Sequence, residues 1–281
     1  VGDWSTNWAM TSEIALAQSD SADGPYKHVK VLLKGRGKGH WDELSVGNPK
    51  LKKFGDKFYL YYQSVNSYLG PTHVHRRYSQ RIGVAVADSI TGPFRHSDEP
   101  IVEPSPPVFN MVNNPGVTKR PEGKYLMILK GDAKPCTTTE HLEQPGIRRS
   151  RLQGLALADH PEGPFVIQKK PAFADLDTED ASLWYDSQRD RYYAIFHAHS
   201  HLGLITSKNG LNWERAKHYM VSDNTFAMTN GKVEKGWKVE RPFVFFEDGT
   251  PKALCLSIRT GDYNTGYCAV VPLEANTKYK K

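Results

Sequence analysis

One phrase recurs along the chain, and it restricts the fold more than any other feature of the sequence. Each copy begins with a small, apolar, alternating stretch, passes through a polar turn into Gly-Pro-aromatic, and ends in a second short strand-like stretch. The copies lie at 14–33, 82–102 and 155–173, with a degenerate fourth copy at 202–221. Alternation at period two is typical of half-buried strands, and Gly with Pro marks a turn. The chain is therefore expected to repeat one β unit.

A second phrase precedes three of these copies and adds two strands to each unit. It consists of a strand, a turn with Gly or Asp, and a strand rich in Tyr, Phe and Leu, and its members lie at 48–64, 114–131, 181–198 and 241–257. Four strands per unit are typical of a propeller blade. We therefore predict an all-β, five-bladed β-propeller that forms a single domain over residues 1–281. Its blades are expected at 1–38, 39–103, 104–173, 174–221 and 222–273.

The first unit carries the outer phrase but lacks the inner one. Either strands of the last blade complete it, or the native chain begins earlier than Val1. We favour the second explanation, in which blade one is N-terminally incomplete. The sequence opens with neither an initiator Met nor a signal peptide, so the compartment is not encoded in it.

Composition removes several classes of function. The chain is 38% hydrophobic and 11% aromatic, enough for a large core, and no run of 18 or more apolar residues predicts a membrane span. The net charge is +6, but the basic residues are scattered and no nucleic-acid motif accompanies them. A solvated surface is favoured, and weak attraction to an acidic polysaccharide stays open. Three cysteines make no disulfide framework; Cys255 and Cys268 could face each other across a hairpin, but core thiols are favoured.

Polar side chains stand ahead of every inner phrase, where a propeller places one mouth of its central channel. They are His40, Asp42, Glu43 and Asn48 in blade two, Asn113 and Asn114 in blade three, Glu179 and Asp180 in blade four, and Glu240 and Arg241 in blade five. Any one of them is as well explained by turn capping, which Asn and Asp perform readily. Four matched positions favour a functional ring, because clustered acids repel one another and lose solvation on burial.

Carboxylates around a sugar-sized pocket are typical of glycoside hydrolysis, in which one acid protonates the leaving oxygen and the other activates water or attacks directly. Adjacent strand residues point to opposite faces, so only one of Glu179 and Asp180 is expected to face the pocket. Asp180 is preferred, because its place ahead of the apolar run matches Asn114 and Glu240 to within one residue.

The phrases VGNPKLKKFGDKFYLYYQS, TEDASLWYD and VERPFVFFEDGTPKAL resemble the five-bladed propeller glycosidases related to glycoside hydrolase families 43 and 117. The similarity covers about residues 12–272. It implies hydrolysis of a glycosidic bond in a plant or algal oligosaccharide, usually exo-acting, in a secreted or periplasmic protein. It also implies three essential acids on different blades, which match Asp180, Glu240 and, as the third, Asp42. A calcium or other divalent ion at the axis is compatible with such folds, but no ligand set in the sequence proves one.

Other polar and aromatic residues are candidates for substrate contact. Arg241 would hold Glu240 ionised or bind a carboxylate or sulfate of the substrate. Three histidines at period two, ending in His201, are expected on one face of a strand, where they would bind sugar or metal, although no fourth metal ligand is evident. Trp184 and Trp41 would stack on sugars, but packing between blades is favoured. The predicted substrate-binding residues are Asn48, Asn114, Glu179, Arg241, His197, His199, Trp184 and His40.

Two other functions stay open. A non-catalytic carbohydrate-binding propeller gains weight if the inner strand of blade one is absent. A glycoside phosphorylase would need a phosphate pocket, and His197, His199, Arg241 and Lys130 are the residues that would form it. The expected partner is an oligosaccharide, with no nucleic acid and no membrane. The sequence encodes neither the sugar, the anomer and the linkage nor the oligomeric state.

Overall fold

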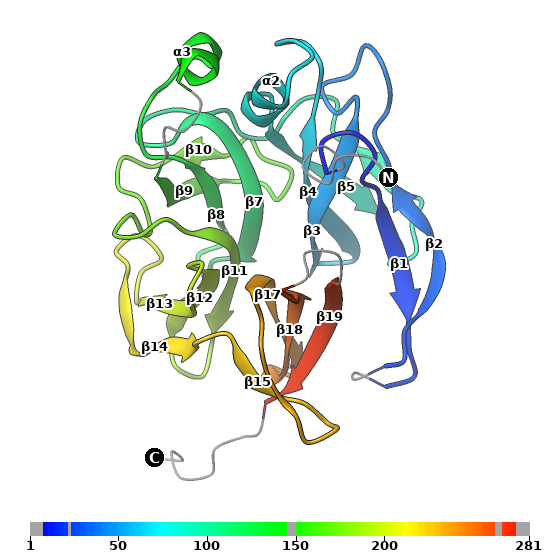
Figure 1. Cartoon of the computed structure of the whole chain (residues 1–281), viewed down its shortest axis with the longest axis vertical. Coiled ribbons are helices and arrows are strands. Elements are labelled where there is room, and N and C mark those ends of the chain that lie inside the picture. The colour runs from blue at the N-terminus through cyan, green and yellow to red at the C-terminus, as the bar shows by residue number, and fades with distance from the viewer. Residues whose placement is uncertain (1–7, 22–23, 145–149, 262–265, 274–281) are drawn as a thin grey trace.

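The protein is an all-β propeller, seen in a computed structural model that describes residues 8–21, 24–144, 150–261 and 266–273. Antiparallel sheets are arranged around a central axis (Figure 1). Two short helices, α2 (His73–Tyr78) and α3 (Thr138–Glu143), lie together at one edge. No helix among the described residues is long and apolar enough to cross a bilayer.

Three blades have four strands each, and the chain runs through them in order from the innermost strand outward. The first consists of β3 (Ser45–Phe54), β4 (Lys57–Val65), β5 (Arg81–Ala87) and β6 (Arg95–His96). The second consists of β7 (Phe109–Lys119), β8 (Tyr125–Asp132), β9 (Arg151–Ala158) and β10 (Val166–Ile167). The third consists of β11 (Glu179–Asp186), β12 (Arg191–His197), β13 (Leu202–Ser207) and β14 (Glu214–Ser222).

The remaining sheets are smaller. The last blade has three strands, β17 (Lys238–Glu247), β18 (Thr250–Arg259) and β19 (Gly266–Pro272). Two-stranded ribbons are formed by β1 (Ile14–Gln18) with β2 (Lys27–Leu33), and by β15 (Thr225–Ala227) with β16 (Val233–Lys235). The described residues thus form four blades of three or four strands, and not the five that the sequence predicted. The reason is visible in the repeat, because the first unit supplies only the outer phrase and its two strands become the β1–β2 ribbon.

The core lies between neighbouring blades. One cluster of buried side chains joins the β3–β6 and β7–β10 blades, a second joins β7–β10 to β11–β14, and a third joins β11–β14 to β17–β19. Trp184 belongs to the third cluster, with ring centroids 5.6 Å from Tyr193 and 5.7 Å from Phe246. Trp41 is buried and stacks on Tyr62. Both indole rings therefore pack against other side chains of the protein, which is the alternative that the sequence analysis favoured over stacking on sugars.

Every innermost strand is interrupted by a β-bulge at the same place. The pairing with the second strand shifts between Gly47 and Lys50, Asn113 and Gly116, Glu179 and Ser182, and Glu240 and Phe243. In each bulge one residue has a left-handed backbone, with φ values of 51° for Asn48, 51° for Asn114, 60° for Asp180 and 57° for Arg241. Asn and Asp tolerate this conformation, whereas Arg adopts it rarely. A bulge re-aims side chains, and here it does so in four strands at once.

Candidate functional site

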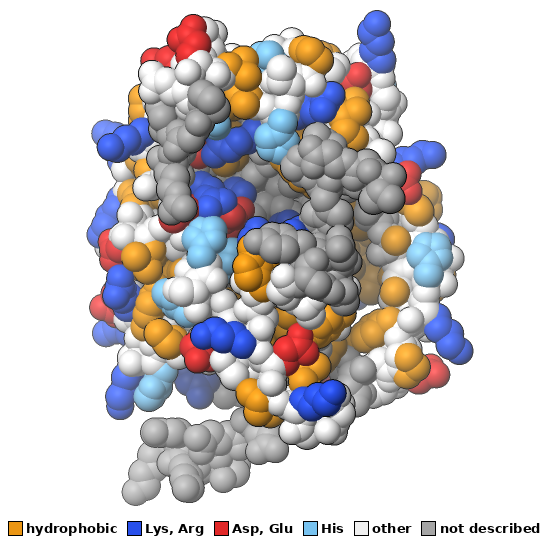
Figure 2. All heavy atoms as spheres, in the orientation of Figure 1, with side chains coloured by type: hydrophobic (Ala, Val, Ile, Leu, Met, Phe, Trp, Pro, Cys, Tyr) orange, Lys and Arg blue, Asp and Glu red, His pale blue; other side chains and the backbone are white. Residues whose placement is uncertain are grey.

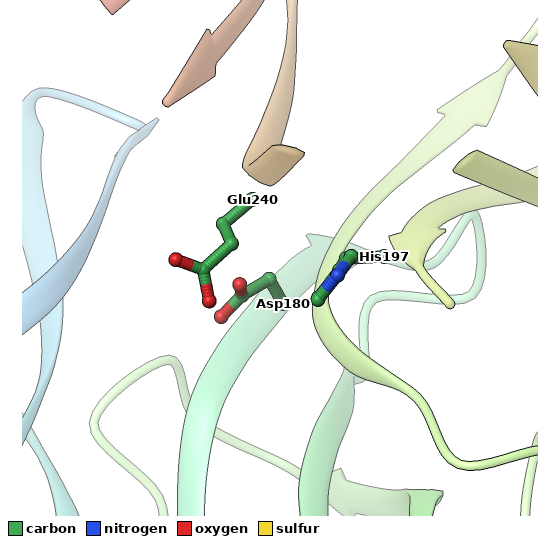
Figure 3. Close-up of side chains that lie close together, drawn as sticks. All are labelled: Asp180, His197 and Glu240. Carbon is green, nitrogen blue, oxygen red and sulfur yellow. The ribbon is translucent and has the colours of Figure 1, made fainter. Parts of the chain in front are cut away.

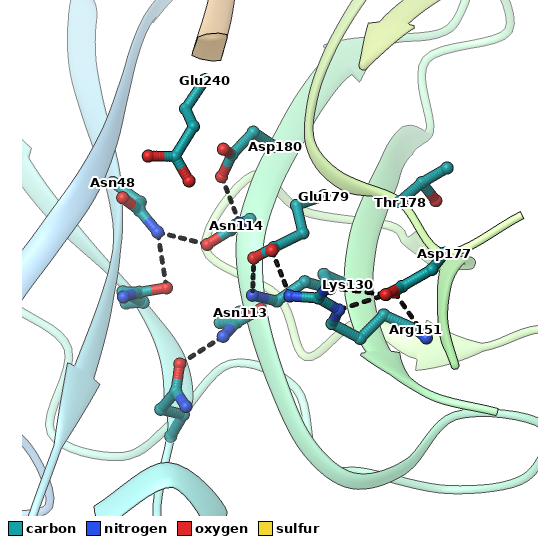
Figure 4. A network of polar contacts seen from close by, with 12 residues as sticks. Asn48, Asn113, Asn114, Lys130, Arg151, Asp177, Thr178, Glu179, Asp180 and Glu240 are labelled. Carbon is teal, nitrogen blue, oxygen red and sulfur yellow. Dashed lines mark hydrogen bonds and ion pairs between the residues drawn. The ribbon is translucent and has the colours of Figure 1, made fainter. Parts of the chain in front are cut away.

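Four bulge residues, one from each blade, form a chain of hydrogen bonds around the axis, and Figure 4 shows the first three of them, Asn48, Asn114 and Asp180. Asn48 Nδ2 donates to Asn114 Oδ1, and Asn114 Nδ2 donates to Asp180 Oδ1. Arg241 donates two hydrogen bonds to the same carboxylate. Its Nη1 lies 2.9 Å from Oδ1, and its backbone nitrogen lies 3.2 Å from Oδ2. We call these four residues the axial arc. It links the hub of the propeller, because Asn48 donates to the next blade, and Asn114 accepts from Asn48 and donates to the blade after its own.

Asp180 is the acid of the axial arc, and it is only 2% exposed. Burial by itself raises the pKa of Asp180, but the nearby cations, Arg241 first and then Lys130, contribute enough together to hold the pKa below its ordinary value. The carboxylate is therefore ionised at neutral pH and held in one orientation by three donated hydrogen bonds.

Glu240 and His197 come together with Asp180 to form what we call the axial cluster. One oxygen of each acid and one ring nitrogen of His197 all lie within 4.8 Å of one another, and the three side chains converge in Figure 3. Glu240 Oε1 is 2.7 Å from Lys238 Nζ, while Oε2 has no hydrogen-bond partner among the described residues. The side chain of Glu240 is 12% exposed. Its second oxygen is thus available to a ligand.

His197 is fully buried, yet neither ring nitrogen has a hydrogen-bond partner within the described part of the chain. Burial lowers the pKa of His197, and the neighbouring acids oppose that shift only in part. The ring is therefore neutral at neutral pH. Buried polar side chains are nearly always partnered, so an imidazole without a partner beside two carboxylates indicates that a ligand supplies the missing contact.

Glu179 also reaches the interior, contrary to the expectation that only one of the two adjacent acids would do so. The bulge turns both side chains inward, so that Asp180 joins the axial arc and Glu179 pairs with Lys130 and Arg151 of the preceding blade. These cations outweigh the effect of burial and hold the pKa of Glu179 well below its usual range. The register of the strands also shows which residues of the last two blades are equivalent. Glu179 corresponds to Glu240, and Asp180 corresponds to Arg241.

Asp42 lies apart from the axial arc and cluster. Its side chain is 0% exposed, with Oδ1 2.6 Å from Arg36 Nε, and with Oδ2 2.9 Å from the Tyr62 hydroxyl and 2.7 Å from His96 Nδ1. Burial raises the pKa of Asp42, but the bonds from His96 and Arg36 bring it below the ordinary value. Its catalytic role stays a prediction, and the contacts are those of a buried structural anchor. His40 lies near it in the chain and is exposed.

The three histidines do not share one strand face. Strand β12 ends at His197, and His199 follows in the turn with a left-handed φ of 55°. His199 is exposed, and its Nε2 lies 2.8 Å from Arg151 and 3.2 Å from Asp177. His201 instead contacts Tyr219. The sequence prediction was wrong here because a turn interrupts the period-two pattern. Figure 2 shows Lys, Arg and His side chains gathered beside the middle of this face of the propeller.

Sequence reasoning missed two contributors to the site. Lys238, which pairs with Glu240, and Lys50, which lies two residues beyond Asn48 and is 8% exposed, were not singled out. A signal was present for Lys50. It stands at a period-two position of the innermost strand, two residues after the turn-like Asn, where the other blades carry Gly116, Ser182 and Phe243.

Comparison with known proteins supports the fold. No protein-family model and no curated protein sequence matches the chain. Zg3597, a family 117 glycoside hydrolase from the marine bacterium Zobellia galactanivorans, is similar in structure, with 20% identity and a TM-score of 0.64 over 92% of this chain and 68% of that one. A thermostable family-43 glycoside hydrolase has 11% identity and a TM-score of 0.67 over 96% of this chain and 84% of that one.

A third similar structure is CoXyl43, a family 43 β-xylosidase/α-arabinofuranosidase from a compost microbial metagenome, solved with xylotriose in a calcium-free form. It is 18% identical, with a TM-score of 0.62 over 99% of this chain and 84% of that one. At these identities the likeness concerns the fold. The chain thus has the β-propeller architecture seen in glycoside hydrolases of families 43 and 117.

Proposed function

We propose that the protein is an exo-acting glycoside hydrolase that removes a terminal sugar from a plant or algal oligosaccharide at the axial cluster. The observation that carries the proposal is the buried, unpartnered His197 beside two carboxylates, Asp180 of its own blade and Glu240 of the next. Two carboxyl groups are the usual machinery of glycoside hydrolysis. The likeness to propeller glycosidases supports the same chemistry.

The two acids receive different roles from their surroundings. Asp180 stays ionised beside Arg241, so it stabilises the positive charge that develops at the anomeric carbon and attacks that carbon. Glu240 would carry its proton on the oxygen that has no described hydrogen-bond partner and donate it to the leaving oxygen, while its other oxygen accepts from Lys238. The neutral His197 hydrogen-bonds a sugar hydroxyl through its unpartnered nitrogens. Asn114 of the adjoining blade holds Asp180 in place, and Asn48 of the blade before it holds Asn114.

The short separation of the acids predicts the stereochemical outcome. Oxygens of Asp180 and Glu240 lie within 4.8 Å of each other. Carboxyl groups roughly 5–5.5 Å apart are typical of retaining enzymes, whereas inverting enzymes leave roughly 6.5–9.5 Å for a water molecule. The first product formed should therefore keep the anomeric configuration of the substrate, as seen by proton NMR early in the reaction. An inverted first product would show that another group activates the water.

The proposal is tested with a panel of plant and algal oligosaccharides, with released monosaccharide measured by chromatography. We expect a single monosaccharide to appear from at least one substrate, without inorganic phosphate. Release only in the presence of phosphate would instead identify a phosphorylase. Substrates that bind without any release would identify the second candidate, a non-catalytic carbohydrate-binding propeller. That candidate is favoured by one observation: only one of the four axial-arc residues is an acid.

A divalent cation is a second possible occupant of the axial cluster. Two carboxylates and one imidazole fit zinc or manganese better than calcium, which takes six to eight oxygen ligands. Such an ion would supply Lewis-acid polarisation of a sugar oxygen. It would also occupy the free oxygen of Glu240, so we propose that it competes with catalysis at that residue.

Metal dependence distinguishes these roles. We expect chelation to leave the release of sugar unchanged, and added Zn²⁺ to inhibit it. The variant His197→Ala should lose most of the Zn²⁺ affinity in calorimetry, since it removes the one nitrogen ligand, while His218→Ala at an exposed position should not. Loss of activity on chelation would contradict this and make the cation a cofactor.

A further inference from the structure

Lys50 is a buried cation on the innermost strand β3, two residues beyond Asn48 of the axial arc. It is 8% exposed, and within the described ranges no hydrogen bond or ion pair reaches its ammonium group. Its one described contact is with the ring of Phe243, whose centroid lies 5.6 Å from Nζ. Lysine is rarely buried to this degree without a partner, so this residue needs an explanation.

The side chain of Lys50 reaches from its own blade to the last one, where it contacts Phe243. Phe243 lies on β17 of the last blade, two residues beyond Arg241, just as Lys50 lies two residues beyond Asn48. Both residues are the first to resume pairing after the bulge of their strand, Lys50 opposite Tyr61 and Phe243 opposite Cys255. The ammonium group therefore lies in the layer next to the axial arc, between the first and last members of that arc.

The acids nearby are already neutralised. Asp180 is paired with Arg241 at 2.9 Å, and Glu240 with Lys238 at 2.7 Å. Burial lowers the pKa of Lys50 to about 8; the charge of Asp180 opposes this shift, and the charge of Arg241 adds to it. Among the described residues, the layer around the arc therefore holds at least one cation more than its carboxylates balance, and the nearby charge of Lys52 adds to this excess. A buried charge is costly unless it is paired, so the missing partner is an anion.

Arg241 supplies the second half of an anion site. Its side chain is 43% exposed, and only Nη1 makes a side-chain hydrogen bond among the described residues. The remaining guanidinium donors face no described acceptor, and a guanidinium matches the planar fork of a carboxylate or the oxygens of a sulfate. Arg241 thus offers donors at the exposed edge, and Lys50 offers a positive charge behind it.

We propose that Lys50 and Arg241 bind an anionic group of the ligand, a carboxylate or a sulfate ester, beside the axial cluster. The ligand is then an acidic saccharide, such as a hexuronate or a sulfated sugar. Calling it a substrate rests on the hydrolase function proposed above, whereas the anion site itself does not. The net charge of +6 agrees with an acidic partner but does not carry the inference.

The test is calorimetric binding of acidic sugars beside their neutral parents. Glucuronate is compared with glucose, and galactose 6-sulfate with galactose, so the two arms separate carboxylate from sulfate recognition. The wild type should bind at least one acidic sugar about tenfold or more tightly than its parent. Lys50→Met should lose that preference, Lys50→Arg should retain part of it, and Lys53→Met, at an exposed position of the same strand, should keep all of it.

Equal affinity of the wild type for acidic and neutral sugars in both arms would overturn the proposal. So would a preference that survives in a folded Lys50→Met protein. Because binding is measured without turnover, an acid preference in a protein that releases no sugar would sustain the anion site while refuting the hydrolase function.

Discussion

Replacement of Glu240 by Gln is expected to lower kcat by about 10²–10⁴-fold, the range that a positioned proton donor contributes. The amide has nearly the shape of the carboxylic acid but cannot donate an acidic proton. One oxygen of Glu240 has no hydrogen-bond partner among the described residues, and its side chain is 12% exposed, so the substitution should leave the fold intact. The measurement is steady-state release of sugar from the substrate found in the oligosaccharide panel, alongside the circular dichroism spectrum and melting temperature.

Two further variants sharpen this result. Asp180→Asn should lose turnover to a similar extent, because it removes the charge that stabilises the transition state, and it should also lower stability, because it leaves Arg241 without its ion pair. Glu247→Gln, at the exposed end of the same strand β17, is the matched control and should be fully active. Near-normal kcat in both Glu240→Gln and Asp180→Asn would refute the assignment of the axial cluster as the catalytic site.

Asp42→Ala is expected to destabilise the protein by about 3–5 kcal/mol, the usual effect of removing one partner of a buried ion pair. The side chain is 0% exposed, and its loss leaves Arg36, Tyr62 and His96 without their shared acceptor. Because Asp42 makes no described contact with the axial arc or the axial cluster, kcat of the folded protein should be unchanged. Urea unfolding gives the free energy, and the control is Asp88→Ala, at a side chain that is 92% exposed.

The same residue predicts a pH dependence. The folded-state pKa of Asp42 is lowered, so its contribution to stability is fully present above the ordinary aspartate pKa of 3.8 and is lost as the pH falls through the folded-state value. The stability difference between wild type and Asp42→Ala should therefore shrink below pH 4. A difference that is constant from pH 6 to pH 3, or a large loss of kcat in the folded variant, would contradict a purely structural role.

Much of the architecture could be predicted from the repeats. The inner phrases at 48–64, 114–131, 181–198 and 241–257 coincide with the first two strands of the four blades. This worked because strand alternation and Gly-containing turns are local signals that survive in every copy. The prediction of five blades counted the first unit as a blade, but the described strands of that unit, β1 and β2, form a two-stranded ribbon.

The site was less predictable, and the bulges are the reason. A strict alternation rule sends Glu179 and Asp180 to opposite faces, but a left-handed residue in the strand breaks that rule. A clue lay in the sequence: Asn48, Asn114 and Asp180 are residue types that accept this conformation. Arg241 carries no such signal, and the ion pair that holds it comes from another blade, which no local pattern reveals.

The axial arc is an open chain of hydrogen bonds with two ends, and the gap between these ends is where the size of the ligand site can vary. Its hydrogen bonds tie Asn48 to Asn114, Asn114 to Asp180 and Asp180 to Arg241, and among the described residues none joins Arg241 back to Asn48. Hydrogen bonds of the arc therefore link the four innermost strands at three junctions, and the junction between β17 and β3 has no such bond. Insertions or deletions in the chain that borders this junction would widen or narrow the gap without disturbing the linked blades. Relatives with differently sized ligands should therefore differ most beside the β1–β2 ribbon and least at the arc.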